Sequence, residues 1–242
     1  MQQIELSLIL PCYNEVEHFT QSVEHILATL KKTGLTYEII FVEDKSTDKT
    51  SELLKGFLRK YKSLPIRIIW QPINLGRGHA VTTGIKNASG SIVGYIDIDL
   101  EVGPQYIAQC VTAIQRRYEL VCAYRRYQFS LRTISRWVAS TSYRKISQIA
   151  FHHNLHDTEA GYKFFKKSTI LPVLKLATDP HWFWDTEIML YSYYAGLKIT
   201  EISVQFNRRM DKTSTVKLIP DTIEYIRKLI RLHKKLKKNI TL

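Results

Sequence analysis

A repeated alternation of short apolar segments with longer amphipathic ones is the feature that most narrows what this chain can fold into. Four apolar runs of strand length occur before residue 100, at 7–11, 37–42, 66–70 and 91–96. Each run is rich in β-branched or aromatic residues, as buried strands are. Between the runs, apolar residues recur at three- and four-residue spacing, as at Phe19, Val23 and Ile26, which is typical of helices. The chain is therefore predicted to be an α/β protein with a mostly parallel sheet flanked by helices.

The second half of the chain repeats this pattern less regularly. Two further strands are expected at 120–124 and 198–206. An amphipathic helix with interleaved basic residues is expected at 131–151, and a last helix after Pro220. These elements extend the predicted fold to nearly the end of the chain.

Polar clusters follow the four early strands at the point where each one ends. They are Pro11–Glu15, Glu43–Asp48, Asn74–Gly78 and Asp97–Asp99. In an open α/β sheet, ligands bind beyond the carboxyl ends of the strands. The four clusters would therefore bring acids, glycines and a cation to one rim of the sheet, where we expect the binding site.

The most informative of these clusters is Asp97-Ile-Asp99. Two carboxylates two residues apart, directly after a buried strand, can both approach one hard cation such as Mg²⁺ or Mn²⁺. Such a cation would keep coordination positions open for diphosphate oxygens. A second interpretation is a polar turn in which Asp99 or Glu101 caps the helix that follows.

The segment around Arg77 resembles a phosphate-binding loop. Gly76 and Gly78 permit close backbone approach, and Arg77 between them can neutralise a diphosphate. The loop lacks the Gly-Lys-Ser/Thr ending of a Walker motif. An ordinary turn before a helix is the alternative interpretation.

The charge balance points to anionic partners without choosing among them. Lys and Arg total 35 against 22 Asp and Glu, a formal charge of +13, and the excess is concentrated near the carboxyl end. Nucleic acid, anionic lipid and phosphorylated small molecules all fit such a balance. No nucleic-acid-binding motif accompanies it, so we expect no nucleic acid partner. We predict a main domain at 1–217 and a basic amphipathic, membrane-proximal helix or tail at 218–242.

Several classes of protein are disfavoured by what the sequence lacks. No window reaches the 18 or so apolar residues of a spanning helix, and the first residues do not form a signal peptide. The three cysteines have no close cysteine partner, which fits a reducing compartment. We therefore expect a cytoplasmic protein that is soluble or peripheral to a membrane.

Taken in order, the motifs resemble those of the family 2 glycosyltransferases with the GT-A fold. The matching segments are Pro11-x-Tyr-Asn-Glu15, the acid-rich stretch from Glu43 to Thr50, Asn74-x-Gly-x-Gly78 with the residues after it, and Asp97-x-Asp99. Later segments, from Asp157 to Lys167, from Phe183 to Glu187 and from Glu201 to Arg209, are similar to the dolichyl-phosphate mannose synthase branch. The resemblance covers roughly residues 6–215.

The resemblance implies roles for individual residues. Those expected to bind the nucleotide are Pro11, Tyr13, Asn14, Glu15, Glu43, Asp44, Ser46, Asp48, Asn74, Gly76 and Gly78. Those expected to hold the metal are Asp97, Asp99 and Glu101, the last standing where relatives often carry Gln. Those expected to be catalytic are Asp97, Asp99, Arg77 and Glu187, and those expected to meet acceptor or donor phosphate are Arg126, Arg209 and Lys163. Departures at Glu159-Ala160 and Lys212–Thr215 concern the acceptor more than the nucleotide.

The implied activity is inverting, metal-dependent transfer of a hexose, mannose or glucose, from a GDP- or UDP-sugar to a polyprenyl phosphate at the cytoplasmic membrane face. A lipid phosphate is already anionic and needs no general base. Transfer to a glycan hydroxyl is the alternative, and it would need a base such as Asp185 or Glu187. Glu187 could equally be a structural carboxylate.

Two expectations concern the membrane. The basic tail suits anionic headgroups or a membrane-anchoring partner subunit, although a helix that only covers the domain would look similar. A membrane-surface binding protein without catalytic activity is the non-enzyme alternative.

Overall fold

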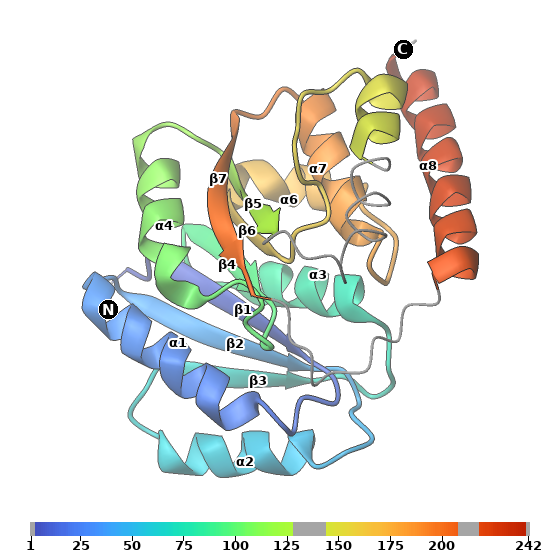
Figure 1. The fold of residues 1–242 in the computed structure, drawn as a ribbon. Helices are drawn as coiled ribbons and strands as arrows, with labels where there is room; N and C mark the ends of the chain where they lie inside the picture. The colour runs from blue at the N-terminus through green and yellow to red at the C-terminus, as the bar shows by residue number, and fades with distance from the viewer. Residues whose placement is uncertain (1–2, 128–143, 208–217, 241–242) are drawn as a thin grey trace.

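One seven-stranded sheet organises the protein. The computed structural model describes residues 3–127, 144–207 and 218–240 (Figure 1). The strands are β1 (Leu6–Cys12), β2 (Tyr37–Glu43), β3 (Ile66–Trp70), β4 (Ile92–Ile96), β5 (Leu120–Tyr127), β6 (Tyr162–Lys166) and β7 (Ile199–Phe206). Their order across the sheet is β3-β2-β1-β4-β6-β5-β7.

Most strand pairs are parallel, as predicted. β3, β2, β1 and β4 run parallel to one another, and so do β5 and β7. β6 is antiparallel to both of its neighbours, β4 and β5. Because β1, β2, β3 and β4 share one direction, their carboxyl ends meet at one rim, and the predicted polar clusters lie there.

Helices cover both faces of this sheet. They are α1 (Phe19–Thr33), α2 (Thr50–Lys60), α3 (Arg77–Asn87), α4 (Ile107–Arg116), α6 (Lys167–Leu174), α7 (Trp184–Tyr194) and α8 (Leu218–Ile240), with a further helical segment at 144–151. Contacts place α1, α2 and α4 on one face and α3, α6 and α7 on the other (Figure 1). The expected helix at 131–151 is described only from residue 144 onward.

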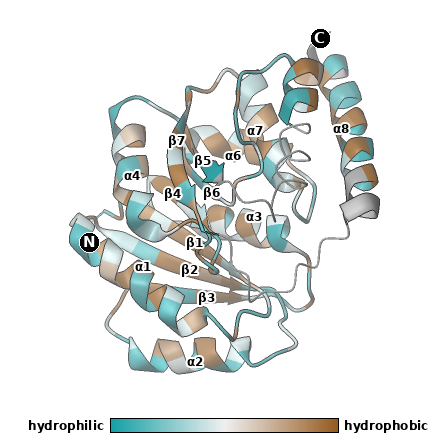
Figure 2. Cartoon of the chain, in the orientation of Figure 1, coloured by the Kyte–Doolittle hydropathy of each residue, from teal (hydrophilic) through white to brown (hydrophobic). Residues whose placement is uncertain are grey.

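The core follows directly from the apolar runs. Every residue of β1 is buried, and the central strands are largely hydrophobic, whereas α1 and α2 turn polar faces outward (Figure 2). Phe19, Phe41 and Phe57 pack with ring centroids 5.6–6.1 Å apart and join α1, β2 and α2. This packing fixes the loops that leave β1 and β2.

The helix α8 lies against the same body as the sheet. Leu229, Leu232 and Leu236 are buried, and the Lys228 Nζ lies 2.7 Å from an Asp179 carboxylate oxygen. The Tyr225 ring meets Phe183 edge-on at 4.9 Å. None of the helices in the described ranges has the length and apolarity needed to cross a bilayer.

Candidate active site

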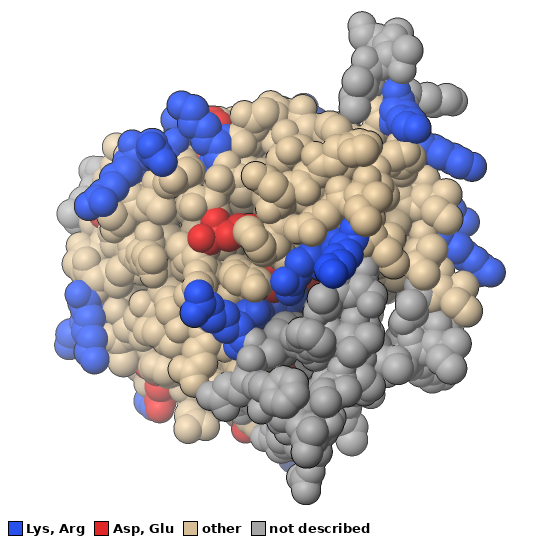
Figure 3. All heavy atoms as spheres, turned by 45° about the horizontal axis from the view of Figure 1, so that its top comes forward, with Lys and Arg blue, Asp and Glu red and all other residues tan. Residues whose placement is uncertain are grey.

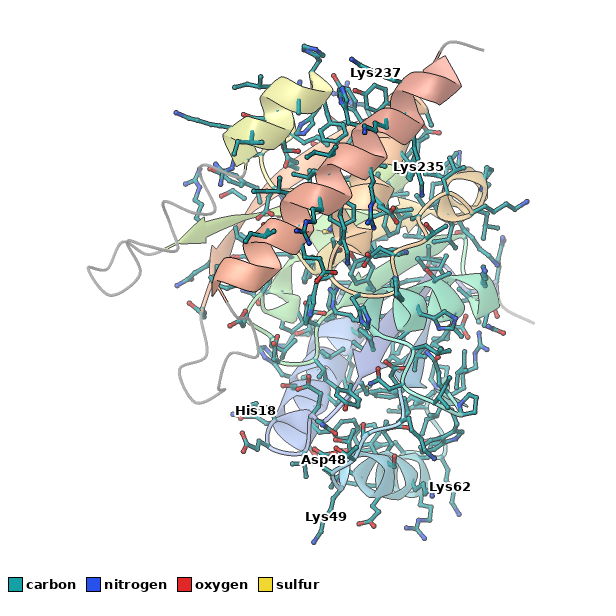
Figure 4. The ribbon with its side chains drawn as sticks, turned by 90° about the vertical axis from the view of Figure 1, so that its right-hand side faces the viewer. His18, Asp48, Lys49, Lys62, Lys235 and Lys237 are labelled. Atoms are coloured by element: carbon teal, nitrogen blue, oxygen red, sulfur yellow. The ribbon has the colours of Figure 1, made fainter. Side chains whose placement is uncertain are left out.

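Two loops at the sheet rim are tied together by the polar residues of the first two motifs. Asn14 adopts a left-handed backbone conformation with φ of 56°, which Asn tolerates better than most residues. Its side-chain oxygen accepts the Thr47 N–H at 2.8 Å, and its own N–H donates to Ser46 Oγ at 3.1 Å. Asp48 accepts the N–H groups of Val16 and Thr50. The loop after β1 is thus held against the loop after β2, and Figure 4 shows His18 and Asp48 at the neighbouring ends of α1 and α2.

The two acids at the end of β2 bind backbone groups. Glu43 accepts the N–H groups of Lys45 and Ser46, which steadies its own loop. The two Asp44 carboxylate oxygens accept the N–H groups of Leu75 and Gly76, each at 2.8 Å. Asp44 therefore positions the loop that leads into α3.

The glycines next to Arg77 make room for a later segment of the chain. A Cβ on Gly76 would lie 2.3 Å from His181 Nδ1, and one on Gly78 would lie 2.5 Å from Trp184 Cβ. Gly76 also has a φ of 94°, which favours glycine. The two glycines therefore allow residues 179–184 to pack closely, and the Gly76 N–H is bonded to Asp44. Phosphate binding at this loop stays a prediction.

Arg77 links the metal motif to the protein interior. Its Nε lies 2.7 Å from Asp97 Oδ1, and its Nη1 lies 2.6 Å from Asp185 Oδ2. The guanidinium also lies over the Trp182 ring, 4.9 Å from its centroid. Burial would lower the pKa of Arg77, but Asp185 and Asp97 raise it well above its usual value. The side chain is therefore a permanent cation at the floor of the site.

A cavity of about 560 Å³ opens between these loops. That volume lies within the range of small-ligand sites. Eleven of the residues predicted for the site line it, namely Pro11, Tyr13, Asn14, Glu15, Asp44, Asp48, Asn74, Gly76, Arg77, Asp97 and Asp99. Three residues predicted to bind the nucleotide do not line the cavity, namely Glu43, Ser46 and Gly78. They stabilise or make room for the loops that form its wall.

His181 and Trp182 line the cavity but escaped the sequence analysis. Trp182 is 60% exposed, so its indole is available at the cavity wall. The signal that could have found it is the aromatic run Trp182-Phe183-Trp184, in which only one residue is free of the core. An exposed tryptophan beside a binding cavity is a platform on which a planar or sugar ring can stack.

Other predicted residues lie away from the cavity. Lys163 is fully buried and bonded to Asp185, so it offers no surface to an acceptor phosphate. The Glu187 carboxylate accepts the N–H groups of Thr178 and Asp179 at 2.6 and 2.7 Å, as a structural carboxylate would. Arg126 is exposed at the end of β5, and Arg209 lies outside the described residues.

The two aspartates fit a divalent cation. Burial raises the pKa of Asp97; Arg77 opposes this, and Asp99 and Asp185 add to it, leaving a pKa above the usual value. A cation beside Asp97 and Asp99 would relieve the repulsion between their carboxylates and favour the ionised form of Asp97. Within the described ranges, no three His, Cys, Asp or Glu residues form a metal-binding group. The third ligand expected at Glu101 stays a prediction. The protein would thus supply two carboxylates and leave the remaining positions to a ligand.

The family model for glycosyl transferase family 2 matches residues 7–171 of the chain. This protein belongs to glycosyltransferase family 2. It is therefore a glycosyltransferase, and the catalytically idle alternative is not supported. The matched span contains the loops after β1 and β2, Arg77, and the two aspartates Asp97 and Asp99.

Curated relatives and solved structures agree with this assignment. The chain is 25% identical to a dolichyl-phosphate β-glucosyltransferase of Trichomonas vaginalis, covering 91% of this chain and 72% of the relative. It is 30% identical to the dodecaprenyl-phosphate galacturonate synthase of Rhizobium johnstonii, covering 76% of this chain and 54% of the relative. Glucosyl-3-phosphoglycerate synthase of Mycobacterium tuberculosis, solved with UDP, superposes with a TM-score of 0.70 at 17% identity, covering 96% of this chain and 80% of that one. The last similarity confirms the GT-A fold.

Proposed function

We propose that this protein transfers a hexose, mannose or glucose, from a GDP- or UDP-sugar to a polyprenyl phosphate at the cytoplasmic face of a membrane, with inversion at the anomeric carbon. The observation that carries the proposal is the cavity, which is lined by Asp97 and Asp99 and by residues of the loops after β1 and β2. Side chains of the family's motifs hold these loops in place. The names of the relatives, which describe dolichyl-phosphate and dodecaprenyl-phosphate enzymes, support the acceptor class.

The donor would occupy the cavity with its diphosphate at the aspartates. Tyr13 is 43% exposed on the cavity wall and offers a ring face to the nucleobase. Asp97 and Asp99 would hold Mg²⁺ or Mn²⁺, which supplies positive charge for the departing diphosphate. Structures of a Pyrobaculum calidifontis mannosyltransferase with GDP-mannose and Mn²⁺, TM-score 0.61, and of the mycobacterial enzyme with UDP support either nucleotide.

The positions of the two candidate bases favour a phosphate acceptor over a glycan hydroxyl. Asp185 is 1% exposed and ion-paired with Arg77 and Lys163, and these cations lower its pKa although burial alone would raise it. Glu187 is occupied by two backbone N–H groups. Neither residue lines the cavity. A lipid phosphate, already ionised at neutral pH, needs no such base to attack from the face opposite the diphosphate.

Transfer assays with the full chain test this proposal. We expect a glycosyl-phosphate lipid when a UDP- or GDP-hexose, Mn²⁺ and a short-chain polyprenyl phosphate are present, with the anomeric configuration of the product inverted relative to the donor. The product is identified by mass spectrometry and its anomeric configuration by NMR. Transfer to sugar hydroxyls with none to lipid phosphate would favour the alternative acceptor, and failure to bind any nucleoside diphosphate would overturn the proposal.

We also propose that α8 contacts the anionic membrane surface. Its outward stripe of Ile223, Ile226 and Ile230 is 41–53% exposed, and Arg227 and Arg231 beside it are exposed. Figure 4 shows α8 lying across one side of the protein, with Lys235 and Lys237 toward its carboxyl end. Figure 3 shows Lys and Arg side chains in several groups over one face, with a small acidic patch near its centre. Apolar side chains flanked by cations suit the boundary of headgroups and acyl chains.

Vesicle binding checks the role of α8. Each cation near an anionic surface contributes about 1 kcal/mol, so reversing Arg227 and Arg231 to Glu should weaken binding to phosphatidylglycerol vesicles at least about tenfold. The matched control reverses two exposed lysines elsewhere, Lys31→Glu with Lys62→Glu, and should bind nearly as the wild type does. Equal losses in both double variants, measured by co-sedimentation, would assign the attraction to overall charge instead of α8.

A further inference from the structure

A buried group of charged side chains lies behind the cavity. Lys163 on β6 is fully buried, and its Nζ lies 2.7 Å from Asp185 Oδ1 on α7. The Tyr95 hydroxyl on β4 donates to the same Asp185 oxygen. Tyr95 and Lys163 are directly opposite each other where β4 pairs with β6. Asp185 on α7 is therefore held against the sheet by side chains from two neighbouring strands.

The chain of contacts continues to the cavity through Arg77. The other Asp185 oxygen lies 2.6 Å from Arg77 Nη1, and Arg77 Nε lies 2.7 Å from Asp97 Oδ1. The guanidinium is also confined by rings, since it lies 5.4 Å from the Tyr95 centroid and 4.9 Å from that of Trp182. The four charged residues thus form the series Lys163, Asp185, Arg77 and Asp97, in which cations and anions alternate.

Such a series is costly to bury, and its inner members, Lys163 and Asp185, do not serve the substrate directly. Removing charges from water carries a large desolvation penalty, which only close, well-paired geometry offsets. Lys163 and Asp185 do not line the cavity, so they do not touch the ligand. At the other end of the series, Arg77 and Asp97 line the cavity.

Without Asp185, Arg77 would be balanced by Asp97 alone. The two side chains would then pair more strongly, and the negative potential that Asp97 offers to a divalent cation would fall. Asp185 anchors Arg77 on the interior side, and Lys163 and Tyr95 anchor Asp185.

We infer that Lys163, Asp185 and Tyr95 are positioning residues that fix Arg77 and, through it, set the affinity of Asp97 for a divalent cation. This inference rests on the proposed function, because it presumes that Asp97 and Asp99 hold the metal. It assigns to Asp185 and Lys163 an indirect role in place of contact with the acceptor.

Binding of Mn²⁺, followed by electron paramagnetic resonance in the presence of UDP or GDP, tests the inference without an activity assay. We expect Asp185→Asn to weaken Mn²⁺ binding at least tenfold, and excess Mn²⁺ to restore most of kcat. The double variant Lys163→Met/Asp185→Asn removes a neutral pair and strands no buried ammonium, and it should lose Mn²⁺ affinity to a similar extent. Tyr95→Phe, which removes only the hydroxyl, should weaken binding about two- to threefold.

The matched control is Glu38→Gln. Glu38 is 5% exposed and its carboxylate is paired with Arg67 at 2.9 Å, and neither residue lines the cavity. It should lose thermal stability with no change in Mn²⁺ affinity. Unchanged Mn²⁺ affinity in the folded Asp185 variants would overturn the inference. If the Asp185 variants do not fold, unchanged Mn²⁺ affinity in Tyr95→Phe would overturn it instead. Failure of the wild type to bind Mn²⁺ with either nucleotide would instead overturn the proposed function.

Discussion

Asp99→Asn should lower kcat for sugar transfer by at least about 100-fold while leaving the fold intact. Removing one preorganised electrostatic group from a site where charge develops typically costs 10²–10³ in rate. Asn retains an oxygen to accept the Glu101 N–H, which Asp99 Oδ1 accepts at 3.3 Å. Stability should therefore change by no more than about 0.5 kcal/mol. Transfer rates at saturating Mn²⁺, together with the thermal midpoint, measure both quantities.

Asp97 calls for a different variant because it also pairs with Arg77. Asp97→Ala would leave Arg77 Nε without its partner, so a loss of activity could reflect disturbed packing. Asp97→Asn keeps an acceptor oxygen and should match the loss seen with Asp99→Asn. Glu24→Gln, which removes one carboxylate paired with Lys60 on the surface, is the control. Full activity in both aspartate variants would refute the metal assignment.

The first half of the fold could be predicted because each strand is a continuous apolar run. β1, β2, β3 and β4 match the expected segments to within a residue or so at each end. Parallel strands buried on both faces leave this unbroken apolar signal. The placement of the polar clusters at one rim follows from strand direction alone, and that is why most of the cavity lining was predictable.

The second half could not be predicted as well, because its key contacts are long-range. β6 contains Lys163, a residue that argues against a buried strand until its partner Asp185, 22 residues later, is known. The burial of Lys163 and Glu187 could not be predicted for the same reason: a sequence pattern does not show which partners a charged side chain will meet. The glycines beside Arg77 illustrate this too, since their close neighbours lie about a hundred residues further along the chain.

Gly161→Ala should be among the most damaging single substitutions in the site. A Cβ there would lie 1.8 Å from Asp97 Oδ2 and 2.4 Å from Arg77 Nη2, far inside contact distance. Asp97 cannot withdraw freely, because its Oδ1 is bonded to Arg77 and its N–H donates to the Gly161 carbonyl at 3.2 Å. Either the carboxylate leaves its position or β6 shifts. We expect kcat to fall at least about 100-fold, as on loss of Asp97, and stability to fall by about 1–3 kcal/mol.

Gly56→Ala supplies the contrast that makes this result interpretable. Gly56 lies within α2, and a Cβ there would meet nothing within 4 Å. Ala is favoured over Gly inside a helix by up to about 1 kcal/mol, so this variant should be slightly more stable and fully active. Denaturant unfolding, transfer rates and Mn²⁺ titration on both variants separate the effect of an added methyl group from its location. An overpacked site cannot retain its geometry. If Gly161→Ala kept its kcat within about threefold and its Mn²⁺ dependence unchanged, the close contact of Gly161 with Asp97 would have no part in holding the metal ligand.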